Sequence, residues 1–164
     1  FNRGTLGQPS FEWQGQRIAP NICYEDLFGE ELAARFFDPA QAPTVLVNFS
    51  NIGWFGNTLA VDQHLQISRM RALELERPMV RATNTGATVI IDHRGVVTHA
   101  LERFSRGVLR GEVHGRGLGV SGGAAITPFA WWASRWGLWP LWLLAGLGVA
   151  AGWLGRRRRT QAQA

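Results

Sequence analysis

The chain has 164 residues, with 17 basic and 12 acidic side chains and a net charge of +5. Every basic residue is Arg, and Cys23 is the single Cys. One Cys excludes an internal disulfide framework and a zinc site built from several Cys. The absence of Lys excludes a P-loop, a Schiff-base enzyme and a Lys-assisted triad made by this chain alone.

The charge is unevenly distributed along the sequence. Four of the Arg are consecutive, at residues 156–159, and the rest of the chain is nearly neutral. A nucleic-acid-binding surface would spread its basic residues over a folded face. We therefore predict no nucleic-acid partner, and the terminal position of the Arg block needs another explanation.

The predicted elements alternate between strands and helices. A short helix over residues 30–37 ends at Asp38-Pro39, and a longer one over 59–77 ends at Pro78, with Val61, Leu65, Met70 and Leu73 at helical spacing. Residues 50–58 form a Gly- and Asn-rich loop. This alternation predicts an α/β fold in which helices bury a sheet. The predicted strands cover residues 18–23, 44–49, 79–82, 87–92, 96–101 and 108–113.

An uncharged segment over residues 137–155 has the character of a membrane span. As a helix it is about 28 Å long, close to the roughly 30 Å of a bilayer core. Trp131, Trp132, Trp136 and Trp139 crowd one end, as in an interfacial aromatic belt, and the Arg block follows the other. We expect a transmembrane helix with its aromatic belt over 131–155. The alternative is a buried core helix of a soluble protein.

The same features predict the topology. By the positive-inside rule, the basic tail over residues 156–164 lies in the cytoplasm. The preceding domain then lies outside the cytoplasmic membrane. Residues 115–130, which include five Gly between 115 and 123, read as a linker between the domain and the span.

Cys23 ends the first predicted strand and precedes Tyr-Glu-Asp. In open α/β sheets, ligands gather at the carboxyl ends of strands, so a thiol there is placed like a nucleophile. Neighbouring backbone N–H groups can hold an oxyanion, and a positive neighbour or a base would favour the thiolate. The alternative for a lone Cys is a small buried apolar side chain.

Two sequence runs carry a family resemblance. The run ICYEDLFGE, residues 22–30, resembles the nucleophile segment of the nitrilase superfamily. Residues 48–97 are similar to the bacterial apolipoprotein N-acyltransferases, with WFG, QH, RMRALE, RP and TNTG in the family's order and spacing. The family also has a last transmembrane helix after its nitrilase-like domain, which matches the predicted span.

The resemblance implies an architecture and a reaction. Residues 1–114 would form the C-terminal half of a nitrilase-like αββα sandwich, followed by one C-terminal transmembrane helix. The family transfers an acyl chain from a phospholipid, through a Cys thioester, to the N-terminal diacylglyceryl-cysteine amine of an apolipoprotein. The implied partners are the phospholipid donor, the apolipoprotein acceptor and the bacterial inner membrane, and no cofactor is implied.

The resemblance also assigns roles to residues. Cys23 would be the acyl-accepting nucleophile, Tyr24 would lend its backbone N–H to the oxyanion hole, and Glu25 would be a supporting carboxylate. For Glu25 a helix-entry carboxylate is an equal alternative. The apolar tip formed by Trp54 and Phe55 would line or cover an acyl-chain pocket, and the alternative is an aromatic plug in the core.

Other polar residues are expected to be structural. Arg71 and Glu74 suit an ion pair within a helix. His64 is among the residues expected to be structural, and the four His show no metal-ligand spacing, so no metal site is predicted. Arg81 and Asn84 are expected to approach the site.

The family triad is Glu, Lys and Cys, and the first two precede the Cys by many residues. Here only Glu12 stands before Cys23 as a glutamate, outside the expected base segment, and there is no Lys. We therefore expect a fragment that is inactive and poorly folded alone. The alternatives are a membrane-tethered nitrilase-type amidase and a non-catalytic, membrane-anchored remnant.

Overall fold

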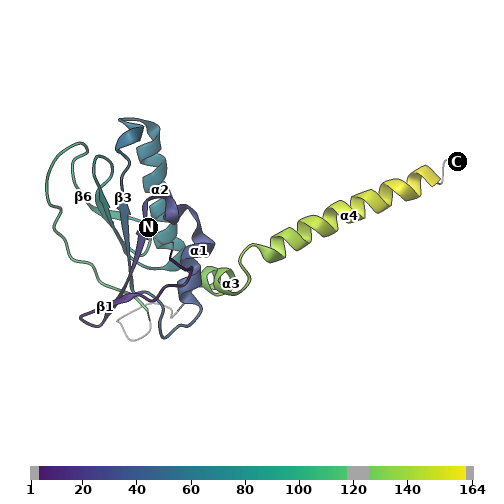
Figure 1. Cartoon of the computed structure of the whole chain (residues 1–164), viewed down its shortest axis with the longest axis horizontal. Helices are drawn as coiled ribbons and strands as arrows, with labels where there is room; N and C mark the ends of the chain where they lie inside the picture. The colour runs from purple at the N-terminus through teal and green to yellow at the C-terminus, as the bar shows by residue number, and fades with distance from the viewer. Residues whose placement is uncertain (1–3, 118–125, 162–164) are drawn as a thin grey trace.

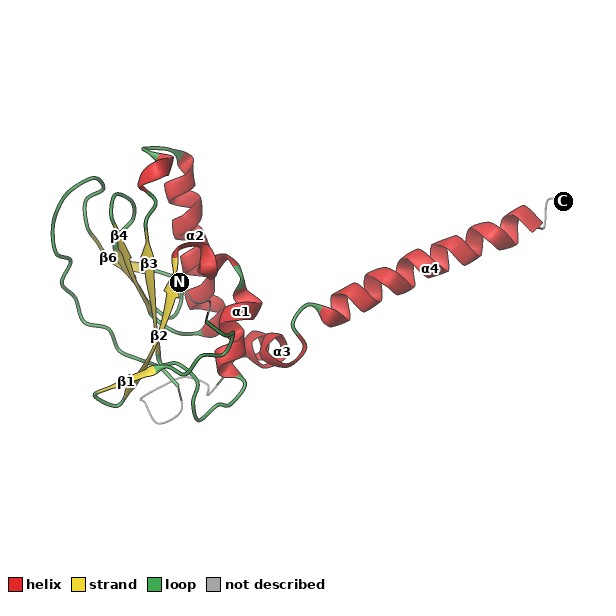
Figure 2. Ribbon diagram, viewed as in Figure 1, coloured by secondary structure: helices red, strands yellow, loops and turns green. Residues whose placement is uncertain are grey.

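A six-stranded sheet in the order β1-β2-β3-β4-β5-β6 forms the centre of the domain (Figure 2). The computed structural model describes residues 4–117 and 126–161. The central strands β2, β3 and β4 are parallel, and the outer pairs are antiparallel. The strands are β1 (Phe11–Trp13), β2 (Gln16–Ile22), β3 (Val45–Ser50), β4 (Met79–Thr83), β5 (Val89–Ile91) and β6 (Val97–Ala100).

The α/β prediction is confirmed, and five of the six predicted strands are present within a residue or two of their expected ends. Strand β1 was not predicted. It pairs with β2 through a two-residue turn, in which Gln14 and Gly15 both have positive φ, at 48° and 75°. This is the backbone of a type I′ hairpin turn, and Gly15 tolerates it without strain.

Helices cover one face of the sheet (Figure 1). Between β2 and β3 the chain forms η1 (Cys23–Leu27), α1 (Gly29–Ala33) and η2 (Ala34–Phe36). Between β3 and β4 it forms η3 (Gly53–Phe55) and α2 (Leu59–Leu75). The core between helices and sheet includes Leu32, Phe36, Leu46, Leu75, Met79 and Ile91.

The buried side of α2 differs from the predicted one. Val61 is buried and Leu65 packs against the core, but Met70 and Leu73 are exposed. Buried Ser68, Ala72 and Leu75 continue the face instead, at the alternating spacings of four and three expected for one side of a helix. The prediction failed because it looked for apolar side chains only, whereas Ser68 enters the core through hydrogen bonds.

The opposite face of the sheet is partly open. Ile22 and Phe49 pair in register and point away from the helices, and they are 63% and 52% exposed. The segment after β6 crosses part of this face, where Gly111 lies against Ile90 and His99. The predicted strand over 108–113 is absent, because this segment forms no strand ladder with its neighbours and Val108 is 81% exposed.

The C-terminal segment forms two helices, α3 (Pro128–Trp136) and α4 (Trp139–Gln161), and Figure 1 shows α4 extending away from the domain. Within the described residues, no helix by itself is long and apolar enough to cross a membrane. The pair α3 and α4 passes that test together, with a bend of 72° between them. The expectation of one helix over 131–155 is therefore corrected to a bent pair, broken where Gly137 has a φ of 53°.

The linker over residues 115–130 stays a prediction. Residues 118–125 lie outside the described residues. Pro128 to Ala130, the end of the predicted linker, already belong to α3. The backbone of α4 also continues into the predicted tail, as far as Gln161.

Candidate active site

Cys23 lies where β2 ends and η1 begins, at the carboxyl edge of the parallel strands. Its φ is 54°, a left-handed conformation that costs a residue with a Cβ about 1–2 kcal/mol. The Ser50 hydroxyl, at the end of β3, donates to Cys23 Sγ at 3.5 Å. Backbone strain of this kind persists where the surroundings fix it, and it is found at active sites.

A buried polar row supports the strand ends below the thiol. Asn21 on β2, Asn48 on β3 and Arg81 on β4 stand in register across the sheet, all on the helix-covered face. Asn48 Nδ2 donates to Asn21 Oδ1 at 2.5 Å and to the carbonyl oxygen of Cys23 at 2.9 Å. The side chain of Asn48 thus fixes the peptide group of Cys23 directly.

Asp26 is the centre of a second polar cluster, which we call the Asp26 cluster. Its carboxylate is fully buried and is bound by His64 Nε2 at 3.0 Å, Ser68 Oγ at 2.5 Å and Arg81 Nη1 at 3.2 Å. His64 Nε2 also lies 3.3 Å from the carbonyl oxygen of Cys23. The cluster therefore ties η1, α2 and β4 together beneath the thiol.

Arg81 brings a positive charge into this buried environment. Burial lowers the pKa of its guanidinium, while the nearby Asp26 carboxylate opposes that shift and favours the cation. A thiolate at Cys23 favours the charged guanidinium in the same way. Among the described residues, Nε and Nη2 of Arg81 have no hydrogen-bond partner. Arg81 is thus a buried cation that interacts electrostatically with Cys23.

Tyr24 and Glu25 lie in η1 on the exposed side of Cys23. The ring of Tyr24 is exposed and stacks edge-on against Phe28, with centroids 6.3 Å apart. Glu25 Oε2 accepts the backbone N–H of Ile22 at 2.7 Å, so this carboxylate closes the turn that follows β2. This contact fits the helix-entry alternative for Glu25, and the supporting role in the site stays a prediction.

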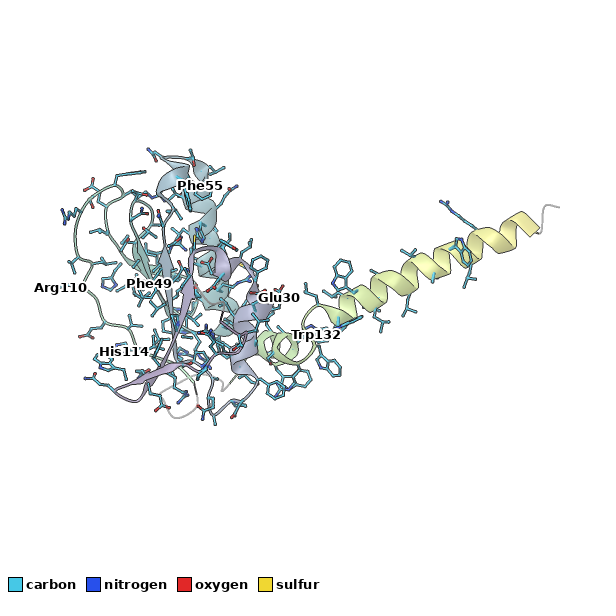
Figure 3. All side chains as sticks on the ribbon, viewed as in Figure 1. Glu30, Phe49, Phe55, Arg110, His114 and Trp132 are labelled. Carbon is cyan, nitrogen blue, oxygen red and sulfur yellow. The ribbon has the colours of Figure 1, made fainter. Side chains whose placement is uncertain are left out.

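Trp54 and Phe55 occupy η3, at the end of the domain where α2 begins (Figure 3). They are 79% and 51% exposed, so neither fills the core of this chain. Asn84 braces the loop: its Oδ1 accepts the N–H of Ile52 at 3.1 Å, and its Nδ2 donates to Asn51 Oδ1 at 2.7 Å. Asn84 thus supports the aromatic loop, whereas Arg81 contacts the cluster beneath Cys23.

The domain has two cavities of note. One, of about 410 Å³, is bordered by Pro20, Ile22, Glu25, Leu32 and Arg35, together with residues 4–8. The second, of about 300 Å³, lies by β5 and β6 and is bordered by His93, His99 and His114. Among the residues that the structure describes, no group of three or more His, Cys, Asp or Glu side chains is arranged to hold a metal ion.

Sequence reasoning identified Cys23 and Arg81, but it missed Asp26, Ser68, Asn48 and Asn21, and it treated His64 as structural. A signal was present. Polar residues occur two apart at the ends of all three parallel strands, as Asn21 and Cys23, Asn48 and Ser50, and Arg81 and Thr83. Such pairs share one face of a strand, so they predict a polar patch within an otherwise apolar sheet.

The sequence and the site define a family. Residues 1–116 match the carbon-nitrogen hydrolase family model. This is most of the chain and includes every residue of the site described above. The chain therefore belongs to the carbon-nitrogen hydrolase family.

Relatives within that family carry a more particular name. The chain is 79% identical to an apolipoprotein N-acyltransferase of Verminephrobacter eiseniae over 138 residues, which is 84% of this chain and 26% of that protein. It is 49% identical to an apolipoprotein N-acyltransferase of Ralstonia nicotianae over 162 residues, 99% of this chain and 29% of that protein. The chain thus spans less than a third of the length of these curated relatives.

Solved structures show the same fold at low sequence identity. An amidase from a Nesterenkonia species superposes with a TM-score of 0.54 at 19% identity, over 66% of this chain and 42% of that one. A carbon-nitrogen hydrolase from Helicobacter pylori gives a TM-score of 0.55 at 14% identity, over 66% and 44% of the two chains. The nitrilase-like α/β fold is therefore shared with both.

Proposed function

We propose that this chain carries the nucleophile and the C-terminal membrane segment of an apolipoprotein N-acyltransferase. The observation that carries the proposal is the placement of Cys23, which is held in a left-handed conformation at the carboxyl edge of the sheet, with Ser50 at its sulfur and a buried cation behind it. The 79% identity to a relative with that name supports the choice among carbon-nitrogen hydrolase reactions.

The proposed reaction has two acyl transfers at one sulfur. The Cys23 thiolate attacks an ester carbonyl of a phospholipid, and the C–O bond breaks to release a lysophospholipid, which takes up a proton. The α-amine of an apolipoprotein's diacylglyceryl-cysteine then attacks the thioester, so that an amide forms, the amine loses a proton and the thiolate is regenerated. A thiolate suits both steps because it is a good nucleophile and a good leaving group.

Residues around Cys23 support these steps in different ways. The N–H of Tyr24 follows the nucleophile directly and would stabilise the oxyanion. Asn48 and His64 hold the carbonyl of Cys23, and the Asp26 cluster holds Arg81 near the sulfur. Exposed Trp54 and Phe55 would contact the acyl chain. The general-base Glu and the oxyanion Lys of the family triad would come from a preceding part of the protein.

The C-terminal helices would tether this chemistry to its lipid substrate. We propose that α4 enters the bacterial inner membrane, with the domain outside the cytoplasm and the Arg-rich end of the helix inside, in accordance with the positive-inside rule. Cys23 would then lie no further from the membrane surface than the diameter of the domain, and a phospholipid donor would have only that distance to cover.

The test is capture of the acyl-enzyme. The longer protein, in which this chain follows an N-terminal part like that of its relatives, is incubated with a phospholipid bearing an alkyne-tagged acyl chain. We expect a hydroxylamine-sensitive label on the peptide containing Cys23, and no such label on Cys23→Ala. This chain alone should give at least 100-fold less label, since removing one oxyanion donor typically lowers rates by about 10²–10³.

Adding an acceptor peptide distinguishes acyl transfer from amide hydrolysis. When a diacylglyceryl-cysteine peptide is supplied, the tag should move from Cys23 to the peptide amine, as seen by mass spectrometry. Release of the tagged acid at the same rate with and without the peptide would instead indicate a hydrolase. Absence of any label on the longer protein would contradict an enzymatic role.

A further inference from the structure

We infer that α3 is an interfacial helix, with one side packed on the domain and the other immersed in the lipid headgroup region of the membrane. The inference concerns how the domain is held at the bilayer, and it rests on α4 being a membrane helix, as proposed above. It would make α3, and the side of the domain that bears it, the surface that faces lipid.

The domain side of α3 is built from small side chains. Ala130 and Ala133, three residues apart, are buried against α1 and η2. Thr127 fixes the start of the helix: its hydroxyl donates to the carbonyl oxygen of Glu74 at the end of α2, at 2.6 Å, and accepts the N–H of Ala130 at 3.0 Å. The orientation of α3 on the domain is therefore defined by packing and by hydrogen bonds.

The outward side of α3 carries Trp131, Trp132 and Trp136, which are 48%, 41% and 56% exposed. Three exposed Trp on a nine-residue helix form an apolar patch that water does not favour. Trp rings have an apolar body and a polar N–H, and this combination favours the boundary between headgroups and acyl chains. Figure 3 shows Trp132 near the joint between α3 and α4.

Arg135 gives this surface its charge. Its guanidinium lies over the rings of Trp131 and Phe37, 5.4 and 5.1 Å from their centroids, and its Nη2 donates to the carbonyl oxygen of Phe37 at 3.2 Å. Phe37 is itself exposed, so the aromatic patch continues from α3 onto the domain. A cation at the rim of an aromatic patch complements lipid phosphates.

The bend between α3 and α4 favours lipid as the partner of the outward Trp face of α3. Two residues separate the end of α3 from the start of α4, and the two axes are bent by 72°. If α4 runs along the bilayer normal, α3 is within about 20° of the membrane plane, as interfacial amphipathic helices are. The outward Trp face is thus continuous with the candidate span, and a protein partner would have to share that position with the bilayer.

The test uses site-directed spin labels in the longer protein, in which this chain follows an N-terminal part like that of its relatives, reconstituted in phosphatidylethanolamine–phosphatidylglycerol vesicles. Replacing Cys23 by Ala, together with any Cys of the N-terminal part, provides a thiol-free background. Single labels are placed through Trp132→Cys and Trp136→Cys on α3, Ala145→Cys on α4, and Arg110→Cys on the opposite side of the domain (Figure 3). Collision rates with oxygen, which enters lipid, and with a nickel chelate, which stays in water, report the depth of each label.

We expect labels at 132 and 136 to favour oxygen over the chelate, at a depth shallower than the label at 145, while the label at 110 favours the chelate. If the label at 132 favours the chelate, as the label at 110 does, the inference is wrong. A label that neither reagent reaches would also overturn it, because it would indicate a protein contact. A lipid depth at 145 without one at 132 would overturn only the interfacial helix, whereas an aqueous label at 145 would contradict the proposed span.

A measurement on the unmodified Cys23 chain guards against misfolding of the thiol-free background. Lipids brominated near the headgroup should quench Trp fluorescence, and the quenched amplitude should fall in Trp132→Phe/Trp136→Phe but not in Trp13→Phe, which changes an exposed Trp of β1. Equal quenching in both variants would contradict the inference.

Discussion

At the scale of single residues, the conformation of Cys23 depends on the polar groups around it. Cys23 contributes the sulfur, but its carbonyl is held by Asn48 and His64, and its turn is held by Glu25. Asp26 and Arg81 are both fully buried, and each is the charge partner of the other. The left-handed backbone of Cys23 is therefore maintained by hydrogen bonds and ion pairs gathered from three elements.

The first prediction concerns Asp26→Asn. This change preserves the shape of the side chain but leaves the buried guanidinium of Arg81 without its counter-charge, so we expect the free energy of unfolding to fall by about 3 kcal/mol. Urea unfolding in detergent, followed by circular dichroism, measures the change.

The matched control is the double variant Asp26→Asn/Arg81→Met, which removes the stranded charge as well. It should recover part of the lost stability, with a coupling energy above about 1 kcal/mol between the two sites. Strictly additive effects of the two substitutions would show that the Asp26–Arg81 pair is not the unit described here.

The sequence indicates Cys23 as a candidate nucleophile, but it does not indicate the residues that position Cys23. Cys23 is visible because a lone Cys follows an apolar strand and precedes Tyr-Glu-Asp. Asp26 and Ser68 are 42 positions apart in the chain, and their side chains meet only when α2 lies on the sheet. Nothing in the local pattern distinguishes Ser68 from a solvent-facing helix residue, which is why the buried side of α2 was misassigned.

At the scale of elements, hydrophobic patterning predicts the helices and strands that bury one face. It fails for elements whose formation depends on tertiary contacts. The central strands β2, β3 and β4 are found because each contains a short, mainly apolar run between turn or helix signals. The run over 108–113 combines Val and Leu with Arg, Gly and Glu, and it forms no strand ladder with its neighbours. The bend after α3 was missed because Gly137 lies within an uninterrupted uncharged segment.

Thr127→Ala gives a prediction at this scale. The variant loses both the cap of α3 and the bond to the carbonyl of Glu74, and loss of such a cap costs about 1 kcal/mol. Amide hydrogen exchange in α3 should accelerate roughly fivefold, while exchange in β3 and β4 stays unchanged.

Thr127→Ser, which retains the hydroxyl, is the control and should exchange like the original chain. If exchange accelerates equally in α3 and in the central strands, the cap stabilises the whole domain and α3 is not an independently docked element.

At the scale of the whole molecule, the two faces of the sheet are unequal. Helices bury one face, while Phe49 and Ile22 on the other remain largely exposed, and Figure 3 shows Phe49 on the side away from α1 and α2. A contiguous apolar face of this kind marks an interaction site or an aggregation hazard. The expectation that this chain folds poorly alone stays a prediction.

The prediction is that the isolated chain binds a hydrophobic reporter dye through this face. Phe49→Thr should lower the dye fluorescence and delay aggregation on warming, because it removes a large exposed ring from the patch. Val108→Thr is the matched control, since Val108 is 81% exposed but lies in the segment after β6. Equal effects of the two substitutions would mean that the open face is not the dye-binding surface.

Because the chain bends at Gly137, a small rotation there moves the far end of α4 over a large distance. With 23 residues and a rise of about 1.5 Å per residue, α4 is about 34 Å long, so a rotation of 10° at the joint displaces its far end by about 6 Å. Conversely, if the far end is held still, the same rotation swings the domain. The distance of Cys23 from a surface that holds α4 therefore depends on a few backbone angles at Gly137 and on the hydroxyl of Thr127. Both residues are far from Cys23 along the chain.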